Sequence, residues 1–235
     1  MKTNKHKQSD LICKNKYGNY IVPASHNRPV TNALKNGDVY EPKTIEFILK
    51  NYNNSAIVTA GTYIGDFLPA FSKIPKVYAF EPVSENYIYA NLNKNLNNLN
   101  NITLENLCLS NKNTVQKMIT NINNVPCGGS SHILLPKQSV SAADKVEEVK
   151  SVRLDDYLSK NDISISIIQL DVEKHETEVI EGAIKTIEKY KPIIIVETKP
   201  KKEIENILFG LGYEYYAEKL HSNYILFIKT NNPNF

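Results

Sequence analysis

The sequence predicts an α/β fold with a doubly wound, largely parallel sheet whose last strand is antiparallel. Short apolar runs alternate with segments of helical periodicity through most of the 235 residues, which is the pattern of such sheets. One run, residues 165–170, is almost continuously apolar, as expected for a strand covered on both faces. Two runs near the end, residues 213–217 and 224–228, flank a polar connection and indicate an antiparallel hairpin.

The remaining strands follow from short apolar runs bounded by polar residues. They are expected at residues 55–60, 77–80, 102–106, 114–119, 149–154 and 192–196. Residues 121–145 have no clear period, which predicts a mobile loop.

The helices follow from apolar residues at helical spacing. They are expected after Pro42, after Gly65, from Ser84, at 155 or 156, at 175–190 and at 201–210. Ser84 can cap its helix. The buried face of that helix is predicted to consist of Ile88, Leu92, Leu96 and Leu99.

Composition excludes several classes of protein. Hydrophobic residues make up 41% and charged residues 23%, which is ordinary for a globular protein. No apolar run approaches ~18 residues, so no membrane span is expected. The three cysteines indicate free thiols in a reducing compartment, which predicts a cytoplasmic protein. The net charge of +3 reflects lysines within residues 1–16. The sequence has no stripe of aromatic and basic residues, so no nucleic-acid partner is expected.

A glycine turn followed by a distant acid is the strongest functional signal. The first strand runs into Gly61 and Gly65, and the second strand ends at Glu81, twenty residues after Gly61. This order of strand, glycine turn, helix, strand and acid binds a ribose through its two hydroxyls. The spacing GxxxG lacks the glycine that brings a backbone close to a pyrophosphate. The ligand implied is a nucleoside carrying an amino acid. Alternatively, Gly61 only permits a positive φ and Gly65 only allows close packing.

Six blocks of sequence, in this order, resemble the FkbM family of S-adenosylmethionine-dependent methyltransferases. They are TAGTYIGDF, VYAFEPVSENY, NITLENLCLSN, RLDDYL, IIQLDVEKHETEVIEGA and KPIIIVE. The resemblance spans about residues 37–197 and implies the Rossmann-like class I methyltransferase fold, with seven strands. It also implies S-adenosyl-L-methionine as cofactor and O-methylation, commonly of a sugar or natural-product hydroxyl. A small-molecule or glycan acceptor is therefore the expected partner. The oligomeric state is not predicted.

The resemblance assigns roles to individual residues. Around the methionine part of the cofactor it places Thr59, Ala60, Gly61, Tyr63 and Gly65, so that a Cβ at Gly61 is expected to enter the cofactor's space. It places Glu81 on the ribose, Pro82, Leu107 and Cys108 beside the adenine, and Asp171 near the methyl group. Two positions depart from the family: Thr59 stands where an acid is usual, and Lys174 stands where a glycine is usual.

Three residues are candidates for activating the acceptor hydroxyl. Asp171, His175 and Glu197 follow strand ends at the carboxyl edge of the sheet, where ligands bind in such folds. We expect Asp171 and a neutral His175 to act together, and Glu173 to point elsewhere. No metal is expected. Each candidate also has a simpler structural interpretation, as a helix cap, a solvated histidine or a polar strand end.

The sequence leaves the role of two segments and the choice between three functions open. The segment from Gly128 to Ser131 is either an acceptor loop or a plain turn. Residues 1–40 are expected to be a polar segment that covers the acceptor site and adds little to the core of the methyltransferase domain, residues 41–235. Two rival functions remain, an NAD-dependent oxidoreductase and a non-catalytic module that binds the cofactor.

Overall fold

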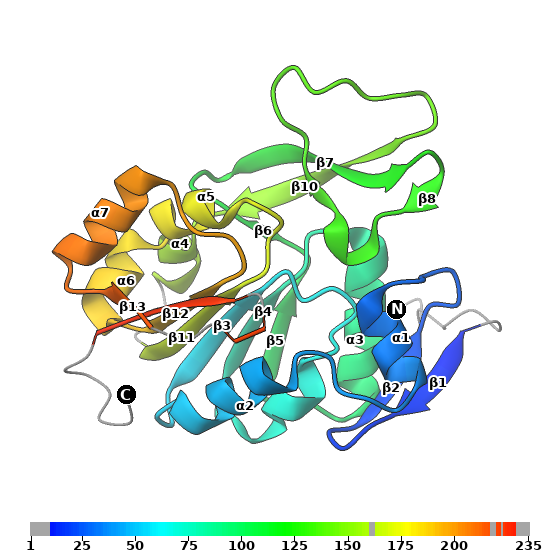
Figure 1. The fold of residues 1–235 in the computed structure, drawn as a ribbon, viewed down its shortest axis with the longest axis horizontal. Helices are drawn as coiled ribbons and strands as arrows, with labels where there is room; N and C mark the ends of the chain where they lie inside the picture. The colour runs from blue at the N-terminus through cyan, green and yellow to red at the C-terminus, as the bar shows by residue number, and fades with distance from the viewer. Residues whose placement is uncertain (1–9, 160–162, 217–219, 222, 229–235) are drawn as a thin grey trace.

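A seven-stranded sheet forms the centre of the computed structural model, which describes residues 10–159, 163–216, 220–221 and 223–228 (Figure 1). The strand order is β13-β14-β12-β11-β3-β4-β5. The strands are β3 (Ala56–Ala60), β4 (Val77–Phe80), β5 (Ile102–Glu105), β11 (Ile165–Leu170), β12 (Ile193–Val196), β13 (Glu214–Tyr215) and β14 (Tyr224–Phe227). Residues 1–9 and, in the predicted hairpin, residues 217–219 and 222 lie outside the described residues.

The strand directions confirm the predicted fold. β12, β11, β3, β4 and β5 are parallel to one another, and β14 is antiparallel to both β12 and β13. From β3 the chain proceeds outward first to β4 and β5 and then, on the other side, to β11 and β12. The carboxyl ends of β3 and β11 therefore form the topological switch point, where a ligand is expected.

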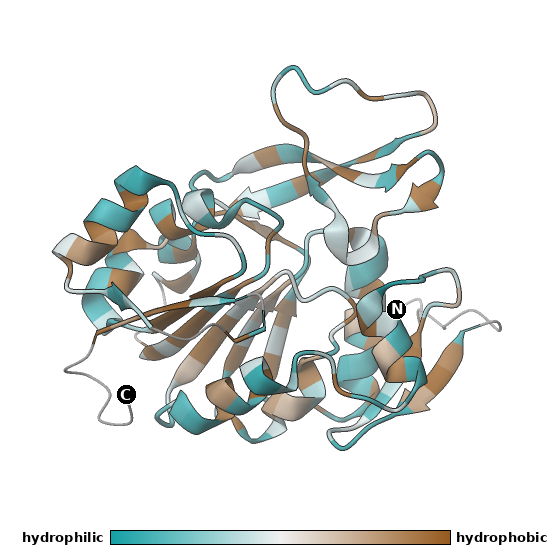
Figure 2. Ribbon diagram, in the orientation of Figure 1, coloured by the Kyte–Doolittle hydropathy of each residue, from teal (hydrophilic) through white to brown (hydrophobic). Residues whose placement is uncertain are grey.

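Two apolar layers cover the sheet. Every residue of β3, β4, β11 and β12 is buried, and Figure 2 shows the hydrophobic residues concentrated in these strands. One face packs against α2 (Pro42–Asn51) and η1, a 3-10 helix (Leu68–Lys73). The other face packs against α4 (Leu154–Leu158), α5 (Glu176–Glu181), α6 (Ile184–Tyr190) and α7 (Lys202–Gly210).

The helix predicted at 175–190 is two helices, α5 and α6. The helix is interrupted at Gly182, where an added Cβ would lie 2.0 Å from the carbonyl oxygen of Ser110. The side chain of Asp155, from α4, caps the start of α6: its carboxylate accepts hydrogen bonds from the amides of Lys185 and Thr186. A side-chain cap of this kind satisfies amides that a helix start leaves unpaired.

The helix α3 (Ser84–Leu96) buries a face that differs from the predicted one. Its buried residues are Asn86, Tyr89, Ala90 and Asn93. Of the predicted residues, Leu96 is exposed and Ile88 and Leu92 are half-buried, while Leu99, beyond the end of the helix, is buried as predicted. Asn93 accepts a hydrogen bond from the Ile21 amide and donates to the carbonyls of Ile21 and Ile64. The N-terminal segment therefore covers this face. Ser84 does not cap the helix; its amide and hydroxyl bind Glu147.

The N-terminal segment has its own buried residues. It forms β1 (Leu11–Lys14), β2 (Asn19–Val22) and α1 (Pro29–Lys35). Tyr20 and Val22 are fully buried and Leu34 nearly so, in a cluster with Tyr63 and Ile64 of the main domain. The expectation that this segment adds little to the core is wrong for residues 20–34.

A second, smaller sheet projects beyond the main one (Figure 1). It consists of β6 (Cys108–Leu109), β7 (Thr114–Ile122), β8 (Val125–Pro126), β9 (His132–Ile133) and β10 (Lys145–Val152). The segment 121–145 is thus partly regular: besides β8 and β9 it contains η2 (Gly128–Ser130). Within the described part of the chain, no helix combines the length and apolar character needed to cross a membrane.

Candidate functional site

Two adjoining cavities lie at the switch point. The first, of about 40 Å³, extends from Gly61 past Glu81 to Cys108. The second, of about 200 Å³, extends from Gly61 to Arg28 and Glu197. Both are lined by Gly61, Tyr63, Gly129, Asp171 and Glu173. A ligand with two different ends can therefore place one end in each cavity.

Glu81 lies at the end of β4 and faces the first cavity. Only 3% of the residue is exposed. One carboxylate oxygen accepts the Tyr63 amide at 2.8 Å, and the other accepts the Val83 amide at 3.0 Å and the Asn86 side chain at 3.3 Å. Burial raises the pKa of Glu81 to about 7. The carboxylate is thus held in one orientation. The oxygen bonded to the Tyr63 amide has a second lone pair for a ligand hydroxyl, and the other oxygen would accept a second hydroxyl in place of the longer bond from Asn86.

The rest of the first cavity is largely apolar. The residues expected beside the adenine, Pro82, Leu107 and Cys108, all line it, as does Ala60. Met118 and Ile133 complete the wall from the smaller sheet. The sequence did not indicate these two residues, because their strands reach the site only through the packing of the smaller sheet.

Gly61 is required by the neighbouring strand. Its φ is +80°, and a Cβ would lie 1.6 Å from the carbonyl oxygen of Asp171. A Cβ would therefore first meet the main chain that follows β11, and the expected clash with the cofactor stays a prediction. Gly65 has a φ of +78°, and its Cβ would come within 3.1 Å of the Ala90 backbone on α3. The fold therefore requires both glycines, and their contact with the cofactor stays a prediction.

Replacing Gly61 by alanine is expected to lower the free energy of unfolding by more than ~4 kcal/mol, in the range of severe core disruption. The main-chain carbonyl cannot retreat easily, because the Asp171 amide is bonded to the Ala60 carbonyl at 3.0 Å. Urea denaturation measures the effect. Gly210→Ala is the control, since a Cβ there meets nothing within 4 Å. Equal stability of the two variants would refute the steric account.

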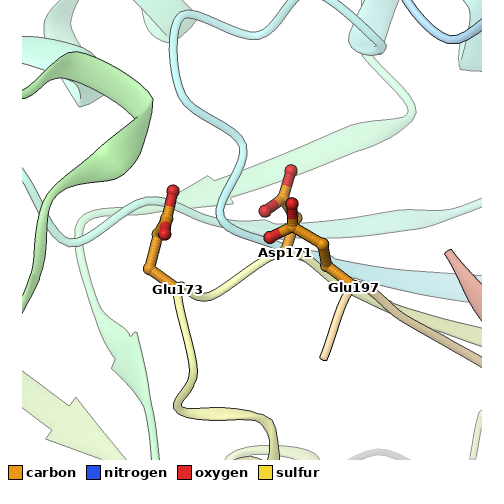
Figure 3. Close-up of side chains that lie close together, drawn as sticks. All are labelled: Asp171, Glu173 and Glu197. Atoms are coloured by element: carbon orange, nitrogen blue, oxygen red, sulfur yellow. The ribbon is translucent and has the colours of Figure 1, made fainter. Parts of the chain in front are cut away.

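Three carboxylates gather at the ends of β11 and β12 (Figure 3). Asp171, Glu173 and Glu197 each offer an oxygen, and these oxygens lie within 4.8 Å of one another. Burial, followed by the nearby Glu197 and Glu41 charges, holds the pKa of Asp171 well above its usual range. Burial and Glu197 also raise the pKa of Glu173. The cluster can share a proton or ligate a divalent cation. The expectation of no metal stays a prediction.

Glu173 joins this cluster, contrary to the expectation that it points elsewhere. Glu173 and Lys174 both adopt left-handed backbone conformations, with φ of 52° and 70°. The chain therefore turns sharply before α5 begins at Glu176. Such conformations in non-glycine residues cannot be read from the sequence, although the unusual lysine at 174 marked the position.

Replacing Lys174 by glycine is expected to raise the free energy of unfolding by about 1 kcal/mol, because a side chain in the left-handed region costs roughly that much. Urea denaturation is again the measurement. Lys185→Gly, in α6, should instead destabilise the protein by a similar amount. A decrease in stability for Lys174→Gly would contradict the backbone geometry.

His175 does not pair with Asp171. Its Nε2 lies 3.0 Å from the Ser110 hydroxyl, and its Nδ1 lies 3.5 Å from the Glu178 carboxylate. Burial lowers the pKa of His175, so the expected neutral form is favoured. Both ring nitrogens are engaged, however, and the expected joint action of His175 with Asp171 is wrong. His175 still lines the first cavity.

The second cavity contains residues that the sequence did not identify. Besides the three clustered acids it is lined by Glu41 and Asp66, and burial raises the pKa of Asp66 to about 7. Thr59 also lines it, and its hydroxyl donates to the Gln169 side chain at 2.5 Å. The missing acid at position 59 is therefore offset by acids from other elements.

The N-terminal segment and the Gly128–Ser131 turn meet at Tyr63. The Tyr63 hydroxyl lies 2.7 Å from Nδ1 of His26, and the two rings stack. A Cβ at Gly128 would come within 3.2 Å of the Tyr63 hydroxyl. The turn is therefore packed against the site, and Gly129 lines both cavities.

The strand order, the glycine turn after β3 and the acid after β4 define the fold of S-adenosylmethionine-dependent methyltransferases. Residues 59–215 match the model of the methyltransferase FkbM domain. The chain belongs to this family, and S-adenosylmethionine is its cofactor.

Solved structures share the fold at low sequence identity. A methyltransferase FkbM from Methylobacillus flagellatus KT is 13% identical, with a TM-score of 0.50, over 84% of this chain. The match covers 52% of that protein, so this chain spans about half its length. A SAM-dependent methyltransferase from Aquifex aeolicus is 14% identical, with a TM-score of 0.41, over 86% of this chain and 94% of its own. M. jannaschii TYW2, solved with AdoMet, is 14% identical, with a TM-score of 0.47. The match covers 94% of this chain and 85% of that protein. No curated protein matches this sequence.

Proposed function

We propose that this protein is a cytoplasmic O-methyltransferase that methylates a hydroxyl of a sugar, glycan or other natural product. The observation that carries the proposal is the junction of the two cavities. A mostly apolar cavity with Glu81 at one side meets a carboxylate-lined cavity at Gly61 and Asp171. The three free cysteines are in keeping with a reducing compartment.

The chain's residues fit the cofactor in a defined direction. Glu81 would accept hydrogen bonds from both ribose hydroxyls, with Pro82, Leu107 and Cys108 around the adenine. The amino-acid part would pass over Gly61, beside Thr59, Ala60, Tyr63 and Gly65. When bound, S-adenosylmethionine supplies a methyl group activated by its sulfonium sulfur.

Asp171 and Glu197 would handle the proton of the acceptor. A hydroxyl in the second cavity can reach Asp171, which lines both cavities. Its raised pKa makes it a stronger base than an exposed aspartate. Asp171 would take the proton of the acceptor hydroxyl, so that the oxygen could act as the nucleophile toward the methyl group that the bound cofactor supplies. Positioning of the reacting atoms supplies much of the rate.

The acceptor class can be tested directly. Purified protein is incubated with S-adenosylmethionine labelled in its methyl group, together with monosaccharides, nucleotide sugars and hydroxylated natural products. The proposal predicts label in an ether-linked methyl group, identified by mass spectrometry and NMR. Label on nitrogen or carbon would contradict O-methylation. Cofactor binding with no transfer to any acceptor would favour the non-catalytic alternative.

A further inference from the structure

We propose that Arg28, from the N-terminal segment, binds the α-carboxylate of S-adenosylmethionine. The inference rests on the proposed direction of the cofactor, with its ribose at Glu81 and its amino-acid end in the second cavity. That end carries one ammonium and one carboxylate. Each needs a partner of opposite charge or a set of hydrogen-bond donors.

The negative charges that line the second cavity attract the ammonium of the cofactor and repel its carboxylate. Its walls include five acids: Glu41, Asp66, Asp171, Glu173 and Glu197. Like charges repel strongly where water is partly excluded. Among the described residues that line either cavity, Arg28 is the only lysine or arginine. The only histidine lining them, His175, has a pKa lowered by burial and lines only the first cavity.

Four backbone amides of the glycine turn are already engaged. The amides of Gly61 and Thr62 both donate to the Phe80 carbonyl, at 3.0 and 3.2 Å. The Tyr63 amide donates to Glu81, and the Gly65 amide donates to the Thr62 carbonyl at 2.8 Å. A helix start or glycine loop often binds an anion through such amides. Here these four amides are directed at protein acceptors.

The hydroxyl groups of the turn are engaged as well. Thr59 donates to Gln169, and Thr62 donates to the Phe80 carbonyl at 2.9 Å. The other polar side chains of the cavity wall, such as Gln169 and Tyr40, carry no positive charge. The charge that matches a carboxylate therefore comes from Arg28.

Arg28 is held in position from two sides. Its amide donates to the Thr31 hydroxyl at 3.0 Å, immediately before α1. Its guanidinium donates to the carbonyl of Cys127, at the start of the Gly128–Ser131 turn. That bond uses one of five N–H donors, and a guanidinium can bind a carboxylate through two more. The positive charge also opposes the effect of burial, which raises the pKa of the nearby Tyr63 hydroxyl.

This assignment changes the role of the N-terminal segment. Residues 1–40 are expected from sequence to cover the acceptor site. With Arg28 on the cofactor carboxylate, the segment becomes part of the cofactor site. It also joins the cofactor to the Cys127 carbonyl, so that bound cofactor would hold the segment and the turn together.

The test compares two ligands that differ in the amino-acid part. S-adenosylhomocysteine has the carboxylate, and 5′-methylthioadenosine lacks the whole amino acid. Calorimetry measures the affinity of each for the wild type, Arg28→Met and Arg28→Lys. Arg28→Met should weaken S-adenosylhomocysteine by roughly tenfold to a hundredfold, as expected for a charged hydrogen-bonded pair. The affinity of Arg28→Met for 5′-methylthioadenosine should stay within about twofold of the wild-type value. Arg28→Lys should retain part of the affinity for S-adenosylhomocysteine.

Lys35→Met is the matched control. Lys35 lies in the same segment and donates to the His26 carbonyl at 3.1 Å, but it lines neither cavity. It removes the same charge and should leave both affinities unchanged. Thermal unfolding of each variant checks that the segment stays folded.

Each outcome separates the assignment of Arg28 from the proposed function. If Arg28→Met binds S-adenosylhomocysteine as the wild type does, the assignment is wrong while the function stands. If Arg28→Met loses affinity for both ligands to the same extent, Arg28 acts only by holding the turn at Cys127, and the assignment is again wrong. If the wild type binds neither ligand, the proposed function itself fails.

Discussion

Replacing Glu81 by alanine is expected to weaken binding of S-adenosylhomocysteine by at least roughly a hundredfold, since two ribose hydroxyls lose charged acceptors. Glu81 is buried, and its carboxylate is fixed by the amides of Tyr63 and Val83. The substitution also leaves these amides without their acceptor. Some loss of stability is therefore expected, and calorimetry must be accompanied by thermal unfolding.

Glu81→Gln separates the two effects. It keeps the size of the side chain and one acceptor oxygen, so the fold should be perturbed less than by alanine. The amide group cannot accept from both hydroxyls, and binding should still fall clearly. Wild-type affinity in either variant would remove Glu81 from the ribose site.

Replacing Asp171 by asparagine is expected to reduce methyl transfer by roughly a hundredfold to ten-thousandfold, the usual contribution of a general base. Affinity for S-adenosylhomocysteine should change little, because the side chain keeps its size. The base acts in its ionised form, and the pKa of Asp171 is raised. The wild-type rate should therefore fall as the pH decreases through this raised pKa. Single-turnover measurements across pH test this.

Glu197→Gln provides the complementary measurement. Glu197 is the largest charge that raises the pKa of Asp171. Its removal should shift the acid limb of the rate profile to lower pH. If Asp171→Asn transfers methyl groups at the wild-type rate, the base lies elsewhere. An unmoved acid limb in Glu197→Gln would show that the two carboxylates do not interact during the reaction.

The central strands could be predicted closely because burial on both faces leaves little choice of sequence. β11 occupies the predicted residues 165–170, and β3 and β12 differ from prediction by one residue at most at each end. Glu81, Asp171 and Glu197 all follow such strands. Parallel strands bring their carboxyl ends to one edge, so the position of these acids could be predicted from sequence.

The remaining features depend on contacts between distant segments. The buried face of α3 is polar at Asn86 and Asn93 because the N-terminal segment and the Gly128 turn supply hydrogen-bond partners. Arg28 reaches the site through α1, and Glu173 does so through a left-handed turn. No periodicity reveals such contacts. The pairing of His175 with Asp171 was wrong partly for the same reason, since one ring nitrogen contacts Ser110 from a distant segment. The other contacts Glu178, three residues further along the chain in α5.

The most direct test of the account is calorimetry of the purified protein with S-adenosylmethionine, S-adenosylhomocysteine and NAD. The structure offers a buried acid at the end of β4, a largely apolar cavity beside that acid and an acidic cavity beyond Gly61. We therefore expect both sulfur-containing nucleosides to bind one to one, with no detectable binding of NAD. Binding of NAD in preference to S-adenosylmethionine would contradict the account.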